Sequence, residues 1–230
     1  MSQTRPCQNL LYGGAYSVAE VARYTNLNAS RVRSWFRGRS DGLGKGPLIQ
    51  RDHPGNSSVF IASFLDMIDV LVAGQFRAQG VKMSSVRAAY ALLREHLDTQ
   101  HPFCHNSLYT DGKRIFLYAA GELADATLHE VVSRQQFFTH VRDSLTRVVY
   151  SDQTSLACKW NISDGVMIDP GICSGKPVVR ETGVSTYVLA NQYRANNRDA
   201  AFVADLFRTT ETDVLNAVDF EHRFGGRRAA

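Results

Sequence analysis

The sequence predicts a mainly helical α+β protein with a winged helix-turn-helix at its N-terminus and a trihelical, helix-turn-helix-like domain at its C-terminus. Three observations lead to this fold class: a capped pair of short amphipathic helices over residues 16–36, helical periodicity through most of the remaining chain, and few, short strand candidates. Apolar residues that recur every three or four positions mark the buried face of a helix. We expect three parts, residues 1–98, 99–165 and 166–230.

Composition and charge restrict the class of protein. With 230 residues, 44% of them hydrophobic and 21% charged, the chain is typical of a soluble globular protein. Its net charge of +4 is too small for a protein that coats nucleic acid by bulk charge. Four cysteines without a C-x-x-C pair favour reduced thiols and a cytoplasmic location. No signal peptide opens the chain, and the most apolar segment, residues 59–73, is too short for a membrane span and carries Asp66 and Asp69.

The stretch YSVAEVARYTNLNASRVRSWF, residues 16–36, has the local signals of a helix-turn-helix. Ser17 and Glu20 match a capping box at the start of the first helix. Asn26 stands at the turn, where the backbone needs a residue that tolerates the left-handed conformation. These signals together predict two short helices joined by a tight turn.

The second helix of the pair is predicted to be a DNA-recognition helix, capped by Asn28 or Ser30. Helical spacing places Val32, Trp35 and Phe36 on an inward face, whereas the arginines point away from it. A basic outer face suits contacts with phosphates and base edges in a major groove. An ordinary amphipathic pair with a solvated arginine face is the alternative. The side chains that we expect to contact DNA are Ser30, Arg31, Arg33, Ser34, Arg37, Arg39 and Arg51.

Glycine and proline residues exclude a helix from the next stretch, which is expected to form the wing. Its two strands would be residues 48–50 and 58–60, with Arg51 touching a phosphate. Helical periodicity then returns over residues 62–79 and from about residue 84 to residue 97, with a glycine between the two helices.

The middle of the chain is expected to combine a hairpin with a further helix. Residues 107–110 and 114–118 flank an Asp-Gly-Lys stretch, which predicts a β-hairpin. A helix is predicted from about residue 128 or 133 to residue 147, with apolar residues at helical spacing inside. Short strands are predicted over residues 156–160, 166–168 and 178–179.

The C-terminal region is predicted to form a trihelical bundle that echoes the helix-turn-helix. Its helices are expected over residues 185–195, 198–207 and 211–224. Ala204 precedes Val214 by ten positions, as Ala22 precedes Val32, and this spacing suits two helices that cross closely. The outer face would repel phosphate, so we expect it to contact protein rather than DNA; its acids are Asp205, Glu211, Asp213 and Asp219.

No catalytic or cofactor motif fits the sequence. The stretch from Gly171 to Gly175 is one residue too short for a phosphate-binding loop. His101, Cys104 and His105 could bind a metal, but they have no fourth ligand nearby. No Ser/His/Asp arrangement and no pair of carboxylates in a glycine-rich cleft stands out. We therefore expect neither an enzyme nor a bound cofactor.

Two stretches resemble known protein families. YSVAEVARYTNLNASRVRSWF resembles the N-terminal helix-turn-helix of the MerR regulators, with Arg33 and Trp35 at the positions of that family's Arg-Tyr-Tyr turn, and residues 64–93 resemble the helices after the MerR wing. IDPGICSGKPVVRETGVST, residues 168–186, with the helices after it resembles the domain of VapB-type antitoxins. The long form of that family joins both parts through a region similar to HPFCHNSLYTDGKRIFLY. The long antiparallel dimerisation helix of MerR proteins is missing after Leu97.

This resemblance implies an antitoxin that binds a PIN-domain ribonuclease toxin and represses its own operon as a homodimer on double-stranded operator DNA. The active site of such a toxin is a cluster of acidic residues around a divalent metal, which a guanidinium can block by pairing with the carboxylates. The candidate toxin-binding side chains are Arg223, Arg227 and Arg228. Two alternatives stay open: a MerR-like transcription regulator with no toxin partner, whose C-terminal bundle serves dimerisation, and an interaction module that binds no DNA.

Overall fold

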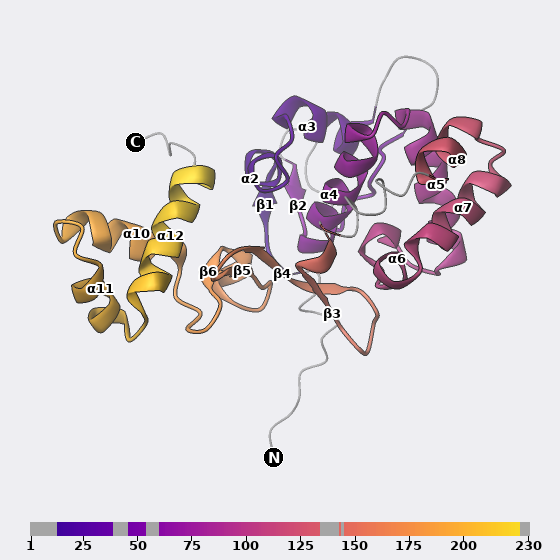
Figure 1. Ribbon diagram of the computed structural model, residues 1–230. Coiled ribbons are helices and arrows are strands. Elements are labelled where there is room, and N and C mark those ends of the chain that lie inside the picture. The colour runs from indigo at the N-terminus through magenta and orange to yellow at the C-terminus, as the bar shows by residue number, and fades with distance from the viewer. Residues whose placement is uncertain (1–12, 39–45, 54–59, 134–142, 144, 226–230) are drawn as a thin grey trace. The chain divides into compact units, whose positions relative to one another are not determined.

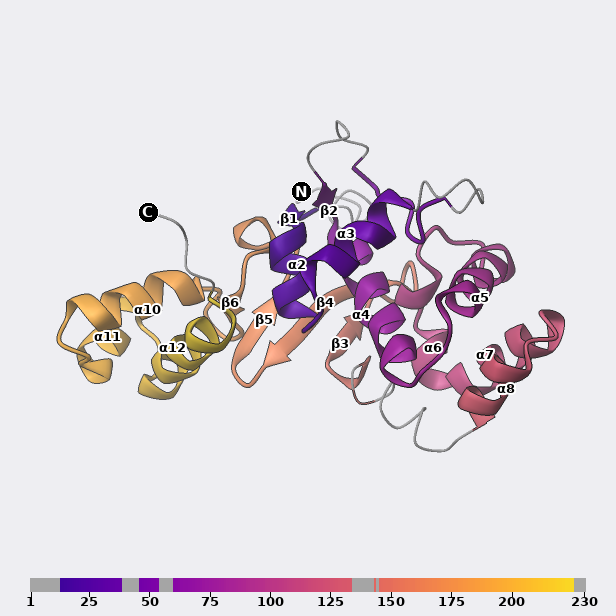
Figure 2. The same cartoon turned by 90° about the horizontal axis from the view of Figure 1, so that it is seen from above.

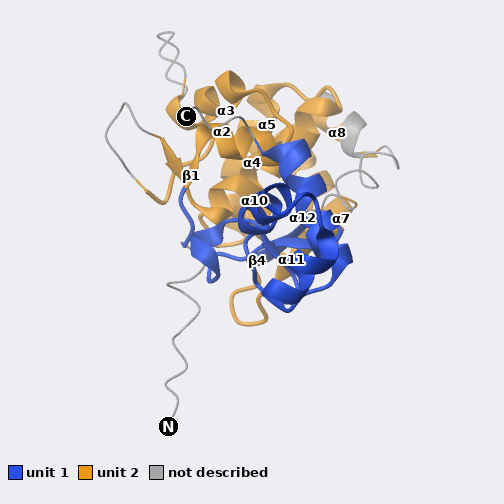
Figure 3. Ribbon diagram, turned by 90° about the vertical axis from the view of Figure 1, so that its left-hand side faces the viewer, with its two compact units in different colours: residues 1–15, 158–230 blue, residues 16–157 orange. Residues whose placement is uncertain are grey.

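The described residues of the computed structural model are 13–38, 46–53, 60–133, 143 and 145–225 (Figure 1). They fall into two compact units, residues 16–157 and residues 1–15 with 158–230 (Figure 3). Helices with short strands make up the units, which confirms the predicted α+β class. None of the helices in the described ranges is long and apolar enough to cross a membrane.

The predicted helix-turn-helix is present in the N-terminal unit as α2 (Val18–Tyr24) and α3 (Ala29–Arg37). The Ser17 hydroxyl accepts a hydrogen bond from the Glu20 backbone N–H at 3.2 Å, and the Glu20 carboxylate accepts one from the Ser17 backbone N–H at 2.9 Å. This is the expected capping box. Asn26 has a φ of 54° and therefore makes the turn in the left-handed conformation. The local signals of the sequence are confirmed for both helices and for their turn.

The segment after α3 does not form the predicted wing strand. Residues 48–50 bend, because the Leu48 backbone N–H donates to the Trp35 carbonyl at 2.8 Å and so binds the end of α3 instead of a second strand. The other predicted wing strand, residues 58–60, lies outside the described residues except for Phe60. The prediction is therefore wrong for the first strand.

Two long helices form the core of this unit. β1 (Tyr16–Ser17) pairs antiparallel with β2 (Ile61–Ala62), and α4 (Phe64–Ala78) follows β2 after one residue. α4 is buried along nearly its whole length, and α5 (Met83–His96) comes next in the chain. Both helices confirm their predicted ranges. In two views at right angles, α4 lies between the helix-turn-helix and the helices that follow α5 (Figure 1 and Figure 2).

The predicted β-hairpin is wrong. The stretch forms two helices instead, α6 (Ser107–Thr110) and α7 (Gly112–Glu122). The tight hairpin turn that an Asp-Gly pair favours requires a positive φ, whereas Asp111 has a φ of −125°. The helix forms because its spacing buries Phe116, whose ring centroid lies 4.8 Å from that of Phe76 on α4. Core packing therefore overrides the local turn signal.

The helix predicted to end at residue 147 is only partly within the described residues. α8 (Ala126–Ser133) confirms its start, and residues 134–142 and 144 lie outside the described part. Leu145 is helical and fully buried, as predicted. The chain then enters β3 (Val148–Tyr150), so the helix ends before residue 147.

A small antiparallel sheet opens the C-terminal unit. β4 (Ala157–Ser163) begins at the boundary between the units and pairs with β5 (Val166–Ile168), with Trp160 opposite Ile168. β5 pairs in turn with β6 (Val178–Val179). All three strands confirm their predicted positions to within a few residues.

The predicted trihelical bundle follows the sheet (Figure 1). Its helices are α10 (Thr186–Ala195), α11 (Ala200–Phe207) and α12 (Glu211–Phe224). One buried cluster joins them, and its members are Val179, Leu189, Val203, Ala204, Val214 and Ala217. Ala204 and Val214, the pair selected by its spacing, both belong to this cluster.

A buried histidine connects separate segments of the N-terminal unit. His101 Nδ1 lies 2.8 Å from the Asp69 carboxylate on α4, and its Nε2 lies 3.0 Å from the Asp52 carboxylate. The Tyr90 hydroxyl on α5 donates to the same Asp69 carboxylate at 2.8 Å. Burial alone would lower the pKa of His101, but the hydrogen bonds to Asp52 and Asp69 outweigh it and raise the pKa to about 10. His101 is therefore a cation between two carboxylates at neutral pH.

We expect the substitution His101→Gln to lower the free energy of unfolding by about 3–5 kcal/mol, because it removes the cation that two carboxylates share. Urea denaturation followed by circular dichroism measures the change. His96→Gln is the control, since His96 is exposed on α5 and its replacement is expected to cost less than about 1 kcal/mol. Equal losses in the two variants would contradict the account.

Candidate nucleic-acid interface

α3 presents a basic face to solvent. Asn28, one of the two predicted caps, accepts from the Ser30 backbone N–H at 2.8 Å and fixes the start of the helix. Val32, Trp35 and Phe36 are buried and hold it from one side. The side chains opposite to them are exposed, as predicted, and include no carboxylate; they are Ser30, Arg31, Arg33, Ser34 and Arg37.

Arg51, expected in the wing between its two strands, lies close to the end of α3. Its guanidinium carbon is 4.6 Å from the centroid of the Phe60 ring, and that of Arg37 is 5.7 Å from the same centroid. One aromatic ring thus holds two predicted DNA-binding arginines together. Arg51 Nη1 is buried and has no hydrogen-bond partner among the described residues. Arg39 lies outside the described residues.

A groove next to α3 adds basic residues that were not predicted. It has a volume of about 550 Å³ and lies between α3, the last part of α4 and the start of α5. Its lining holds three arginines and no carboxylate; the residues are Ser30, Arg31, Ser34, Trp35, Arg77, Met83, Ser84 and Arg87. α5 starts here after Lys82 with no side-chain cap, so the positive end of its dipole adds to the charge of the arginines. This groove suits a phosphate group.

Two of these arginines were missed because they occupy polar positions of ordinary amphipathic helices. Arg77 donates to the Val81 carbonyl, and Arg87 donates to the Gly46 carbonyl, so each side chain is oriented by the backbone of another segment. Only the fold brings them next to α3. One signal could have identified them: residues 77–87 contain three bases and no acid.

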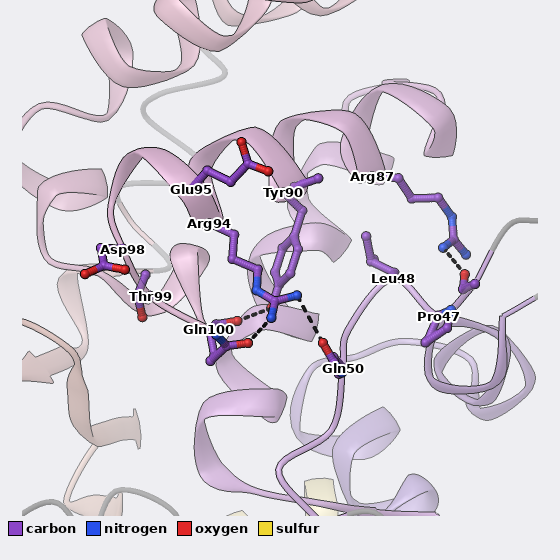
Figure 4. A pocket seen from close by; sticks show the side chains of 12 residues that line it. Pro47, Leu48, Gln50, Arg87, Tyr90, Arg94, Glu95, Asp98, Thr99 and Gln100 are labelled. Atoms are coloured by element: carbon purple, nitrogen blue, oxygen red, sulfur yellow. Dashed lines mark hydrogen bonds between the residues drawn. The ribbon is translucent and has the colours of Figure 1, made fainter.

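A second cavity lies between the segment after α3 and helix α5 (Figure 4). It has a volume of about 780 Å³, and from its wall Arg94 donates to the Gln50 side chain at 3.1 Å while Arg87 binds the Gly46 carbonyl. Carboxylates also line this cavity, so it suits an anion less well than the groove next to α3 does. Residues 46–50 are therefore held between α3 and α5.

The C-terminal unit exposes large apolar side chains. Phe202 and Leu206, one turn apart on α11, are 51% and 54% exposed, and Leu215 on α12 is 48% exposed. Tyr187 and Val188 at the start of α10 are exposed as well. Exposed apolar side chains such as the neighbouring Phe202 and Leu206 are available for a contact with another protein.

Arg223 on α12 is exposed, as its predicted contact with a partner requires. Its guanidinium lies 3.5 Å from the Asp219 carboxylate and 5.3 Å from the centroid of the Phe224 ring. An exposed ion pair of this kind contributes little, so Arg223 can exchange Asp219 for a carboxylate of a partner. Arg227 and Arg228, the other two predicted residues, lie outside the described residues.

The structure does not bring the three potential metal ligands His101, Cys104 and His105 together. His101 and Cys104 lie together, but with Asp69 as their neighbour rather than His105. The His105 ring instead accepts from the Ser107 backbone N–H at 3.3 Å. In the described part of the chain it belongs to no cluster of metal-binding side chains.

Comparisons with known proteins find one family model that matches part of the chain. Residues 166–220 match the family described as "Protein of unknown function (DUF433)". No curated protein matches the chain. Among solved structures, the chain is similar to the one described as the X-ray crystal structure of Rv2018 from Mycobacterium tuberculosis, with a TM-score of 0.71 and 22% sequence identity over 89% of this chain and 97% of that one. A similarity at this level of identity shows a common fold.

The end of α3 depends on a close approach of two backbone segments. Gly38 has a φ of 76° and a ψ of 173°, a conformation that is essentially restricted to glycine. A Cβ at this position would lie 2.7 Å from the carbonyl carbon of Gly46.

We therefore expect Gly38→Ala to lower the free energy of unfolding by about 2–4 kcal/mol, because it adds a steric clash to backbone strain. Gly80→Ala is the control: Gly80 has a φ of 86°, but a Cβ there would meet nothing within 4 Å, so strain alone is expected to cost about 1–2 kcal/mol. Thermal denaturation compares the two variants. A larger loss for Gly80→Ala would contradict the packing described at the end of α3.

Proposed function

We propose that the protein is a DNA-binding antitoxin that represses its own operon and neutralises a PIN-domain ribonuclease in the cytoplasm. The exposed face of α3, with three arginines and no acid, is the observation that carries the DNA-binding part of the proposal. The resemblance of residues 168–186 to VapB-type antitoxins and the exposed apolar side chains of the C-terminal unit support the toxin-binding part.

The chemistry of α3 is that of a helix that reads a major groove. An arginine such as Arg33 can donate two parallel hydrogen bonds to the O6 and N7 atoms of a guanine. Arg31 and the basic groove would hold a backbone phosphate, which fixes the register of the helix on the duplex without reading sequence. Because the net charge of the chain is only +4, this local concentration of bases supplies the attraction to DNA.

A homodimer would place two copies of α3 on two half-sites of one operator. Helix-turn-helix dimers bind half-sites about 34 Å apart, one turn of the double helix, and their operators share the twofold symmetry of the protein. We therefore expect a nearly palindromic operator close to the start of the operon.

Toxin binding would use the C-terminal unit. The apolar side chains Phe202, Leu206 and Leu215 would be covered by the partner, and Arg223 would pair with a carboxylate of its active site. The alternative, a transcription regulator with no toxin partner, covers the same apolar side chains with a second copy of the chain. An interaction module that binds no DNA leaves the basic face of α3 without a role.

Arg33→Ala is expected to weaken operator binding by about 1–3 kcal/mol, because it removes a base contact or a well-placed phosphate contact. A gel-shift titration with DNA from upstream of the reading frame measures the affinity. Arg180→Ala is the matched control, an exposed arginine of the C-terminal unit whose loss is expected to leave the affinity unchanged. An affinity of Arg33→Ala equal to that of the wild type defeats this assignment.

Leu206→Glu is expected to abolish co-purification of the product of the neighbouring gene, the proposed PIN-domain ribonuclease, when the two are co-expressed, because a carboxylate cannot be buried in an apolar contact without a partner. Growth of cells that express the nuclease gives a second readout, because the wild-type protein is expected to restore growth on co-expression and Leu206→Glu is not. Val149→Glu, at a side chain 41% exposed on β3, is the control and is expected to retain the nuclease. If the wild type retains no nuclease and Leu206→Glu only dissociates a homodimer, the regulator without a toxin partner is the correct function.

A further inference from the structure

A cluster of metal-binding side chains lies in the N-terminal unit and takes no part in the proposed contacts with DNA. Its members are Asp52, Asp66 and His101, and their ligand atoms all lie within 4.8 Å of one another. We infer that these three residues bind one divalent transition-metal ion, for which Zn²⁺ is the appropriate probe.

The imidazole of His101 is oriented as that of a metal-binding histidine. Its Nδ1 lies 2.8 Å from Asp69, a fully buried carboxylate that also accepts from the Tyr90 hydroxyl at 2.8 Å and from the Phe103 backbone N–H at 3.1 Å. A histidine that binds a metal commonly donates its other ring N–H to such a carboxylate, which fixes the ring and makes the ligand nitrogen more basic. Asp69 thus directs Nε2 of His101 toward the cluster.

One candidate ligand atom of the cluster has no hydrogen-bond partner among the described residues, and the two others bind each other. Asp66 accepts from the Ser63 backbone N–H with Oδ2 at 2.9 Å, while its Oδ1 is buried and has no hydrogen-bond partner among the described residues. Asp52 accepts from the Ser63 hydroxyl with Oδ2 at 2.6 Å, while its Oδ1 lies 3.0 Å from His101 Nε2. An ion would bind Asp66 Oδ1 and replace the hydrogen bond between Asp52 Oδ1 and His101 Nε2, so its ligand atoms are two carboxylate oxygens and one imidazole nitrogen. A buried oxygen without a donor is costly, and a cation would satisfy it.

The charge of the cluster also favours a cation. Three carboxylates, those of Asp52, Asp66 and Asp69, lie close to the one imidazole of His101, and a protonated His101 balances only one carboxylate charge. The ion pairs that the described residues form with Asp52 and Asp69 come from His101. A divalent ion would displace the proton from Nε2 and offset the excess charge.

One nitrogen and two carboxylate oxygens form a ligand set that suits Zn²⁺ and other first-row divalent ions. The Asp52 side chain is 12% exposed, whereas that of His101 is 1% exposed, so solvent reaches the cluster from the Asp52 side. This route would admit the ion and leave a coordination position for water. Asp52 directly follows the segment that binds the end of α3, so the ion would join this segment to the first turn of α4. The metal site itself does not depend on the proposed DNA binding.

Zinc titration of the full chain, stripped with EDTA and dialysed, tests the inference. We expect isothermal titration calorimetry to show about one tight site per chain and the melting temperature to rise with Zn²⁺, since a ligand that binds the folded state stabilises it. Asp66→Asn is expected to weaken Zn²⁺ binding at least about tenfold. Its amide oxygen can still accept from the Ser63 N–H, so the variant is expected to fold, which circular dichroism verifies.

Three further measurements separate this site from other metal binding. Asp98→Asn, at an exposed carboxylate of the same unit, is expected to bind Zn²⁺ as the wild type does. Cys173→Ser, which removes an exposed thiol, is expected to do the same. With Co²⁺ as a spectroscopic probe, a thiolate charge-transfer band would place the ion on a cysteine and overturn the inference. No Zn²⁺ binding by the wild type, or equal binding by Asp66→Asn, would overturn it as well and leave His101 as an ion-paired cation.

Discussion

The pairing of His101 with Asp52 and Asp69 is the constraint on which the N-terminal unit depends. Asp69 comes from the buried helix α4 and Asp52 from the chain just after the segment that binds α3. The same segment is attached at its other end, where the Leu48 N–H binds the Trp35 carbonyl. α3 thus projects its arginines from a support fixed at both ends. A binding site held by rigid elements in this way reaches its ligand with little reorganisation.

The helix-turn-helix could be predicted because its signals are local. The capping box of Ser17 and Glu20 and the left-handed Asn26 depend on residues a few positions apart. The histidine pairs join residues 32 and 49 positions apart, a proximity that only the fold creates. The wrong hairpin prediction also shows that local signals do not include contacts made by the fold. The Asp-Gly pair at residue 111 predicts a hairpin turn, but a helix forms there because it buries Phe116 against aromatic residues of other elements.

The sequence predicts the arginines of α3 on the candidate DNA face, but not the arginines that other helices add beside them. The arginines of α3 are exposed because the apolar positions of one amphipathic helix determine which side faces solvent. Arg51 was expected in the wing between its two strands, but it packs with Arg37 against the ring of Phe60. Arg77 and Arg87 join the face only through the packing of α4 and α5. The exposed apolar residues of α11 were not predicted, because periodicity alone does not distinguish a core face from a face that a partner covers.

Sequence-specific binding of double-stranded DNA through α3 is the central claim, and one measurement tests it most directly. The affinity of the full chain is compared, at physiological salt, for DNA from upstream of its reading frame and for a scrambled duplex of equal length. The proposed function predicts at least about 10³-fold tighter binding to the upstream DNA, with an affinity for both duplexes that falls steeply as salt rises. Equal affinity for the two duplexes, or no binding to either at low salt, would contradict it.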